Sequence, residues 1–417
     1  MISKMLPFCG LLVFNSLIAQ SKPIPQGKPV SSQALANANN AFAANLYKEL
    51  YKPNEAVFYA PYSITSAFSL LFAGTDGQSE TDIAKTFGWD KNTTQHATAF
   101  AQLSKSLTKQ KSAATGIFKP ANRLFASKET TFSADYQKLV QNTYQAGIEP
   151  VDFLQPEATA QLINTWVGKQ TEQKIKQIVP PKGLDKNTRL VLVNAVYFLA
   201  EWEAGFDPAN TQKADFWADK KTPQKANFMQ AHFPPDNLNQ MKRKFGYKKT
   251  ASYETFEMPY KGNAYSMLVV LPSEKSSLSA LVNQLSPAKL AELDKDLAYD
   301  YEQVSLSLPK WTASYSLSLR ASLEKMGLGS LFKKLDFSRA LSGSGLGLSL
   351  SDVLHKSFID VSEKGTEAAA VTAIMIESPN APRELKRVDF KANRPFLYYI
   401  KDKDSGTILF MGQYVKP

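Results

Sequence analysis

The stretch that most constrains the fold is RLVLVNAVYF, residues 189–198, a long run of mostly apolar and β-prone residues. A strand with one face in water alternates polar and apolar residues, whereas a strand covered on both faces is almost continuously apolar. We therefore expect a central strand here, in a sheet that carries protein on both faces. Runs of similar character predict further strands at residues 265–271, 304–308, 358–361 and 407–412.

Helical patterns dominate the first half of the chain. Apolar residues recur at helical spacing in residues 33–51, 63–72, 95–108, 133–141 and 162–178, and the last of these ends before a Pro-Pro pair. Most predicted helices precede most predicted strands, and no linker or repeat separates the two groups. The order predicts one α+β domain over residues 37–417, although 417 residues would by length alone suit two or three domains.

The first 20 residues have the features of a secretory signal peptide: Lys4, a mostly apolar stretch at 6–18, and small residues from Ala19. The apolar stretch is shorter than the ~20 residues that cross a bilayer. Residues 21–36, rich in Pro, Gln and Lys, are expected to be a flexible lead-in. We expect a secreted or periplasmic protein without a membrane span.

The one cysteine, Cys9, lies inside the predicted signal peptide. The exported chain would then contain no disulfide, no catalytic thiol and no Cys-based zinc site. Its net charge of +11 suits a polyanion binder, but ordinary protein surfaces reach similar values.

The sequence offers little for catalysis. The three histidines, His96, His232 and His355, are far apart, and no HExxH, GxSxG, P-loop or dinucleotide fingerprint occurs. A scattered Ser/His/Asp triad is recognised by geometry and stays open at this point. We expect no enzymatic activity, no cofactor, no metal and no nucleic-acid partner.

The segment EKGTEAAAVTAIMIE, residues 363–377, has two faces when taken at period two. One face carries the small or apolar residues Thr366, Ala368, Ala370 and Thr372, and the other begins and ends with glutamate. Such a strand can enter the middle of a sheet without overpacking, and the SPNAPR that follows cannot continue a central strand. Propensity alone favours an Ala-rich helix capped by Thr366 instead, so the residues by themselves leave both structures open.

Several segments resemble the serpin family, in family order and over nearly the whole chain from about residue 37 to 417. The segment at 363–377 is similar to the hinge of the serpin reactive-centre loop. The other similar segments are NEAVFYAPYSI at 54–64, with Ala60 where serine is usual, the stretch 162–198, MPYKGNAYSMLVVLP at 258–272, LPKW at 308–311 and the ending at 390–417. The chain is identified from these motifs as a member of the serpins.

The resemblance implies a large central β-sheet, two smaller sheets, about nine helices and an exposed reactive-centre loop at about 363–388. It also implies a monomeric suicide inhibitor of serine endopeptidases. The target protease cuts the loop and forms a covalent acyl-enzyme, and the loop then enters the central sheet and traps the protease. A cysteine protease as target, or a non-inhibitory or polyanion-binding serpin, is the alternative.

The resemblance assigns the hinge to Glu363, Gly365, Thr366, Glu367, Ala368, Ala369, Ala370, Val371 and Thr372. Gly365 would supply backbone freedom where the loop bends. The usual family spacing places the scissile bond at Pro379, and the further candidates are Glu377, Ser378, Asn380 and Arg383.

Two supporting groups follow from the same motif matches. Ser63, Asn194 and His355 resemble the shutter, the hydrogen-bonded centre of the sheet. Trp202, Lys310 and Glu363 resemble the breach at the end of the sheet where the loop enters, with Lys310 able to pair with Glu363. Ordinary core packing is the alternative account of His355 and Trp202.

Two clusters of basic residues are the basis for the alternative that the protein binds a polyanion. Lys105, Lys109 and Lys111 lie on or after a predicted helix, and the second cluster contains residues 242–244, Lys248 and Lys249. Charge runs of this kind are usually solvated faces, so we expect at most weak polyanion binding.

Overall fold

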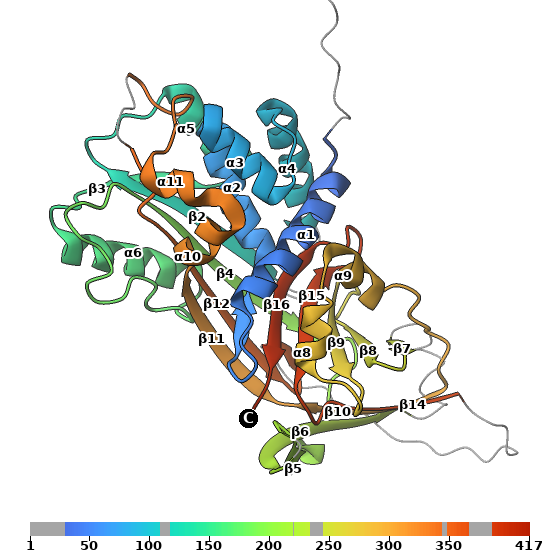
Figure 1. Ribbon diagram of the computed structural model, residues 1–417. Coiled ribbons are helices and arrows are strands. Elements are labelled where there is room, and N and C mark those ends of the chain that lie inside the picture. The colour runs from blue at the N-terminus through green and yellow to red at the C-terminus, as the bar shows by residue number, and fades with distance from the viewer. Residues whose placement is uncertain (1–29, 109–116, 220, 234–244, 344–347, 367–385) are drawn as a thin grey trace, which may run out of the picture.

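A computed structural model describes residues 30–108, 117–219, 221–233, 245–343, 348–366 and 386–417. Within these ranges the chain forms three β-sheets with helices packed against them (Figure 1). The α+β class and the three-sheet architecture expected from the sequence are confirmed. Among the described helices, none is long and apolar enough to span a bilayer.

The main sheet has six strands and contains the longest strands of the protein. Its order is β11 (Trp311–Ser318), β12 (Asp352–Ser362), β13 (Gly365–Thr366), β4 (Leu190–Glu201), β2 (Ile117–Ser127) and β3 (Gly147–Val151). Alternate residues of β4 contribute to two separate apolar clusters, one on each face of the sheet. Burial on both faces explains why residues 189–198 are almost continuously apolar.

Two further sheets pack beside the main sheet. The second sheet contains β1 (Val57–Tyr59), β16 (Ile408–Tyr414), β15 (Phe396–Asp402), β9 (Tyr265–Pro272), β8 (Tyr253–Pro259) and β7 (Gly246–Lys249), in that order. The four-stranded sheet contains β14 (Arg387–Lys391), β10 (Gln303–Pro309), β6 (Gln224–Phe233) and β5 (Gln212–Phe216), in that order.

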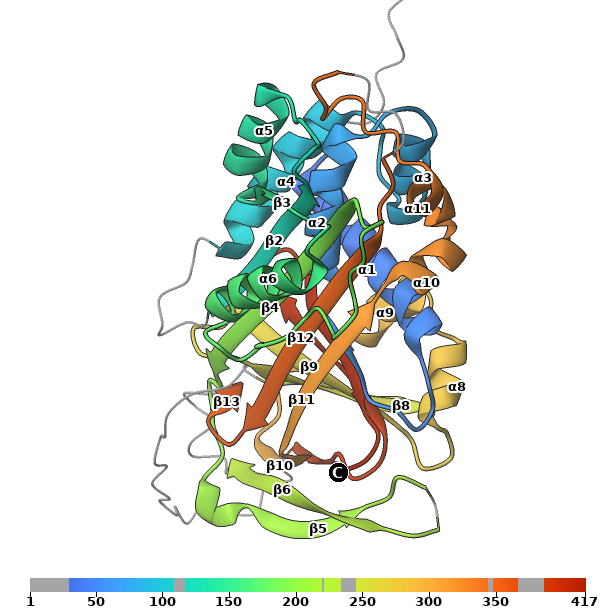
Figure 2. The same cartoon turned by 90° about the vertical axis from the view of Figure 1, so that its left-hand side faces the viewer.

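Most helices gather on one side of the main sheet, and α6 lies on the opposite face (Figure 2). The helices are α1 (Ser32–Leu50), α2 (Pro61–Gly74), α3 (Gly77–Phe87), α4 (Thr93–Thr108), α5 (Ala134–Tyr144), α6 (Pro156–Gln170), α8 (Leu278–Asn283), α9 (Pro287–Leu293), α10 (Arg320–Leu323) and α11 (Gly329–Lys333). The smaller apolar cluster lies between α6 and the sheet and includes Ile163 and Val191.

Two sequence-based boundaries were wrong. The last part of the lead-in expected over residues 21–36 is helical instead, because α1 begins at Ser32 and the Ser31 hydroxyl accepts a hydrogen bond from the Ala34 N–H at 3.1 Å. The helix expected at 162–178 is displaced toward the N-terminus. Pro156 starts α6, and after Gln170 the chain turns, with left-handed backbone angles at Glu172 and Gln173. The apolar residues beyond this turn are buried without being helical.

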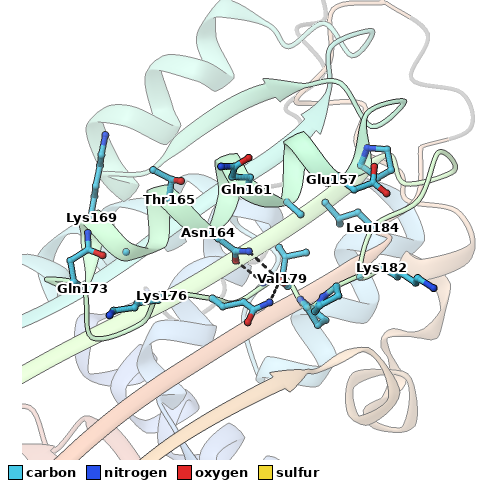
Figure 3. Close-up of a pocket in the computed structure, with 17 residues that line it drawn as sticks. Glu157, Gln161, Asn164, Thr165, Lys169, Gln173, Lys176, Val179, Lys182 and Leu184 are labelled. Atoms are coloured by element: carbon cyan, nitrogen blue, oxygen red, sulfur yellow. Dashed lines mark hydrogen bonds between the residues drawn. The ribbon is translucent and has the colours of Figure 1, made fainter.

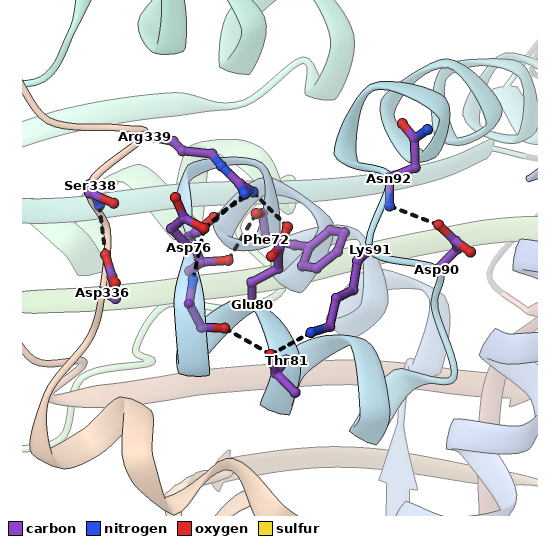
Figure 4. A network of polar contacts seen from close by, with 12 residues as sticks. Phe72, Asp76, Glu80, Thr81, Asp90, Lys91, Asn92, Asp336, Ser338 and Arg339 are labelled. Atoms are coloured by element: carbon purple, nitrogen blue, oxygen red, sulfur yellow. Dashed lines mark hydrogen bonds and ion pairs between the residues drawn. The ribbon is translucent and has the colours of Figure 1, made fainter. Parts of the chain in front are cut away.

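An ion network holds the corner between α2 and α3 (Figure 4). The Arg339 guanidinium donates to the Thr75 carbonyl oxygen at 2.8 Å and to Glu80 Oε1 at 2.6 Å, and its Nη2 lies 2.9 Å from Asp76 Oδ1. Arg339 lies on the segment between α11 and β12. The network therefore ties the end of α2 to the chain that leads into the main sheet.

Candidate functional site

The two central strands of the main sheet, β4 and β12, are joined at one end and parted at the other. They run parallel and pair directly along residues 191–196 and 352–357. Beyond that stretch β13 lies between them and pairs antiparallel with both, so that Thr366 is opposite Val361 on one side and Ala200 on the other. We call the boundary between β4 and β12 the seam; Figure 2 shows β13 at its open end.

Gly365 is required by the way the chain enters the seam. Its φ is +146°, a backbone conformation that residues with a Cβ atom rarely adopt. A Cβ at this position would lie 2.3 Å from the Ala200 carbonyl oxygen and 2.6 Å from the Glu201 Cα, far inside contact distance. Only glycine lets the backbone turn from β12 back into the sheet at such close approach.

Thr366 is almost completely buried in the seam, with 1% of its surface exposed. Its hydroxyl lies 2.8 Å from the hydroxyl of Tyr260, and the Tyr260 ring stacks on Trp202 at a centroid distance of 4.5 Å. Trp202 Nε1 in turn donates to the Ser362 carbonyl oxygen at 2.9 Å. Trp202 thus lies at the open end of the seam and contacts Thr366 only indirectly, because Tyr260 lies between them. Tyr260 was not among the residues predicted from the sequence.

Glu363 is held from three sides just before β13. Its carboxylate accepts hydrogen bonds from Lys310 Nζ and Thr211 Oγ1, each at 2.8 Å, and its carbonyl oxygen accepts one from the Phe206 N–H at 2.8 Å. The Glu363 side chain is 8% exposed and that of Lys310 43%. Burial is the largest single influence and raises the pKa of the Glu363 carboxyl, but hydrogen bonds from Lys310, its own backbone N–H and Thr211, together with the Lys310 charge, hold its pKa below the ordinary value.

Ser63, Asn194 and His355 meet in the closed part of the seam. His355 on β12 is opposite Asn194 on β4, and His355 Nδ1 hydrogen-bonds to Asn194 Oδ1 across the seam. The Asn194 amide then donates to the Ser63 carbonyl oxygen at 2.9 Å and also contacts the Ser63 hydroxyl. All three residues are fully buried.

Asn122 and the backbone of Ala60 also belong to this network, and neither was predicted from the sequence to do so. Asn122 on β2 lies opposite Asn194, accepts a hydrogen bond from its amide and donates to Ser66 Oγ at 2.8 Å. Ala60, which has no side-chain hydroxyl, takes part through its backbone N–H, which donates to His355 Nε2 at 3.1 Å. No sequence pattern marked Asn122, because the residues around it include Lys119, Pro120 and Arg123 and do not predict a buried strand.

His355 is neutral in this arrangement. Its Nε2 accepts a hydrogen bond, so the ring proton is on Nδ1, where it donates to Asn194. Complete burial lowers the pKa of His355 to about 3. In the described part of the chain none of the three histidines contacts a carboxylate: His96 bonds to Ser69 and His232 to Ser305 and Gln303. The described residues therefore contain no Ser/His/Asp triad, and they hold no cluster suited to a metal ion.

Helix α6 and the segment after it cover the seam (Figure 3). Asn164 on α6 accepts hydrogen bonds from the N–H groups of Ile178 and Val179, at 2.8 and 2.9 Å. Lys356 on β12 donates to the Gln177 carbonyl oxygen at 2.6 Å, which ties the same segment to the sheet. A cavity of about 570 Å³ lies between α6 and this segment. Any strand that enters the seam must pass beneath this cover.

Several predicted residues lie outside the described ranges. They are Cys9, hinge residues Glu367 to Thr372, the scissile-bond candidates Glu377, Ser378, Pro379, Asn380 and Arg383, and the basic residues Lys109, Lys111 and 242–244. Of the described cluster members, Lys105 is exposed on α4. Lys248 donates to two backbone carbonyl oxygens and Lys249 pairs with Glu254 at 2.9 Å, so both cations already have partners within the protein.

The described fold is thus of a particular class: an α+β protein whose main sheet admits a short strand of its own chain at one end of a central seam. A family model described as serpin (serine protease inhibitor) matches residues 37–417. Human Serpin B3 is 34% identical over 401 residues, which cover 92% of this chain and 100% of that protein. Human leukocyte elastase inhibitor is 34% identical over 395 residues, with coverage of 92% and 100%.

Solved structures agree with the sequence relatives. Serpin48 of the insect Tenebrio molitor superimposes with a TM-score of 0.80 at 29% identity, covering 92% of this chain and 98% of that one. The chain belongs to the serpin family.

Proposed function

We propose that this serpin is a suicide inhibitor of serine endopeptidases, and that its loop, residues 363–388, becomes a strand of the main sheet after cleavage. The observation that carries the proposal is the position of β13 between β4 and β12. A chain that continues from Thr366 in the direction of β13 would run along the seam, antiparallel to both neighbours. The native protein thus already holds the first two residues of such a strand.

Insertion requires a limited number of interactions to break. The direct pairing of β4 with β12 covers six residue pairs, and the His355–Asn194 bond crosses the seam at one of them. In exchange, a new strand of about a dozen residues would form backbone hydrogen bonds with both β4 and β12. Each bond would contribute ~1 kcal/mol, and apolar burial would add to this gain. This gain rivals the ~5–15 kcal/mol that stabilises a typical domain, so the native state would be kinetically trapped.

The described contacts suggest how the trap is kept closed. The Lys310–Glu363 pair would restrain the chain at the open end of the seam, and the network of His355, Asn194 and Ser63 would hold the closed part. A partly buried ion pair is a stronger restraint than an exposed one, since losing a partner leaves Glu363 uncompensated. We assign these groups the breach and shutter roles respectively.

The relatives support inhibition as the activity. The family model describes protease inhibitors, and the name of the leukocyte elastase inhibitor states an inhibitory function for that protein. We also propose that the chain is exported through its first 20 residues and acts as a monomer, with a covalently bound protease as its partner.

Incubation with a panel of serine and cysteine proteases tests the proposal. We expect at least one serine protease to form an SDS-stable complex, and mass spectrometry of the released C-terminal peptide to identify the scissile bond. Cleavage of the loop by every active protease, without any covalent complex, would contradict inhibition and leave the non-inhibitory alternative. A complex with cysteine proteases alone would reassign the target class.

A further inference from the structure

A cavity of about 610 Å³ lies where the three sheets meet, beside the open end of the seam. Its floor is aromatic: Trp311 of β11 lies 5.1 Å from Tyr398 of β15 and 5.3 Å from Tyr414 of β16, measured between ring centroids. All three side chains are buried. A concave aromatic surface of this volume suits the apolar body of a small molecule.

The rim of the cavity carries four lysines and the terminal residue Pro417. Lys213, Lys225, Lys310 and Lys416 line it, and no Asp or Glu side chain is among the lining residues. In the described part of the chain Lys225 pairs with Asp215, while no ion pair involves Lys213 or Lys416. The ammonium groups of Lys213 and Lys416, which have no ion-pair partner among the described residues, favour an anion beside the low-dielectric floor. An anion with an apolar body complements both parts of the cavity.

We propose that this cavity binds a small amphiphile with one anionic head, a carboxylate or a sulfate, on an acyl or aromatic body. The body lies against Trp311 and Tyr414, which keep 8% and 6% of their surface exposed, and the head lies at the lysine rim. The volume falls within the range of ordinary ligand pockets, ~300–1,000 Å³.

The site is coupled to the seam through Lys310. This lysine lines the cavity and also pairs with Glu363, the carboxylate that precedes β13. The ligand head and the Glu363 carboxylate therefore compete for one ammonium group. Coupling between two sites is reciprocal, so bound ligand weakens the Lys310–Glu363 pair, and loss of the Glu363 charge strengthens ligand binding. The ligand would thus regulate the end of the sheet that receives the loop.

Isothermal titration of the full chain with octanoate tests the site, with 1-octanol as the neutral match. We expect octanoate to bind at one site and ~10-fold more tightly than 1-octanol, the effect of one charge-assisted contact. Lys310→Met is expected to remove that advantage. Lys182→Met changes an exposed lysine on the cover of the seam, far along the chain from the cavity, and is expected to leave binding unchanged.

Two further variants separate the site from general charge effects. Glu363→Gln is expected to tighten octanoate binding ~3-fold or more, because Lys310 loses its competing partner. Ala313→Phe, on β11, fills the cavity and keeps all four lysines, so it is expected to abolish binding. Equal affinity for octanoate and 1-octanol, or wild-type binding by Ala313→Phe, would overturn the proposal. The titration contains no protease, so its outcome is independent of whether the chain traps one.

Discussion

Replacing Thr366 by arginine tests whether the seam receives the loop. The native side chain is 1% exposed and its hydroxyl lies 2.8 Å from that of Tyr260. A guanidinium at this position would cost several kcal/mol of desolvation, together with ~1 kcal/mol for the lost hydrogen bond. The cost offsets the few kcal/mol that the pairing of β13 with its two neighbours provides at ~1 kcal/mol per hydrogen bond. We therefore expect the leading end of the loop to be expelled from the seam.

The assay compares covalent trapping with simple cleavage. Wild-type protein is expected to give an SDS-stable complex with its target protease, whereas Thr366→Arg is cleaved and releases active protease. Thr366→Val keeps the shape of the side chain and is expected to trap protease, with stability lowered by ~1–3 kcal/mol because the buried Tyr260 hydroxyl loses a partner. Thr98→Arg, at an exposed position on α4, controls for the added charge.

One result would refute this reasoning. If Thr366→Arg traps protease with the same stoichiometry as wild type, residues after Gly365 do not enter the seam with Thr366 facing the interior. The β13 pairing would then be a feature of the native state without a role in trapping.

Three further predictions concern the same site. Gly365→Ala is expected to lower the free energy of unfolding by ~2 kcal/mol or more, measured by urea denaturation, because its Cβ would overlap the Ala200 carbonyl oxygen and its φ is unfavourable. Lowering the pH from 7 to 5 is expected to cost ~2 kcal/mol through His355. Its folded pKa of about 3 lies below the ordinary value of 6.5, so the stability present above pH 6.5 is lost as the pH falls toward 3. His96, with a pKa of about 4, acts in the same direction, and His355→Gln should therefore reduce the slope of stability against pH without abolishing it. Asn122→Leu is expected to destabilise the protein by ~1–3 kcal/mol, measured by thermal unfolding, because it removes the donor to the buried Ser66 hydroxyl and one acceptor of the buried Asn194 amide.

The sequence by itself determined the layered architecture. Continuous apolarity in 189–198 predicts a strand covered on both faces, and β4 contributes to an apolar cluster on each side. Helical periodicity placed α1, α2, α4 and α5 correctly because side chains three or four apart share one helix face. The end of α6 was mispredicted, since the same apolar spacing continues into a buried turn whose left-handed residues leave no periodic signal.

Only the tertiary structure decided how the site is assembled. His355, Asn194 and Asn122 form one row because the register of three strands aligns them, and register depends on packing among residues far apart in sequence. The placement of Gly365 and Thr366 between β4 and β12 follows in the same way, because local propensity left strand and helix both open. The cavity at Lys310 exists only where three sheets converge. Local sequence patterns specify which face of a helix or strand is buried. The seam, the row of hydrogen-bonded side chains and the cavity depend on contacts between different helices and strands.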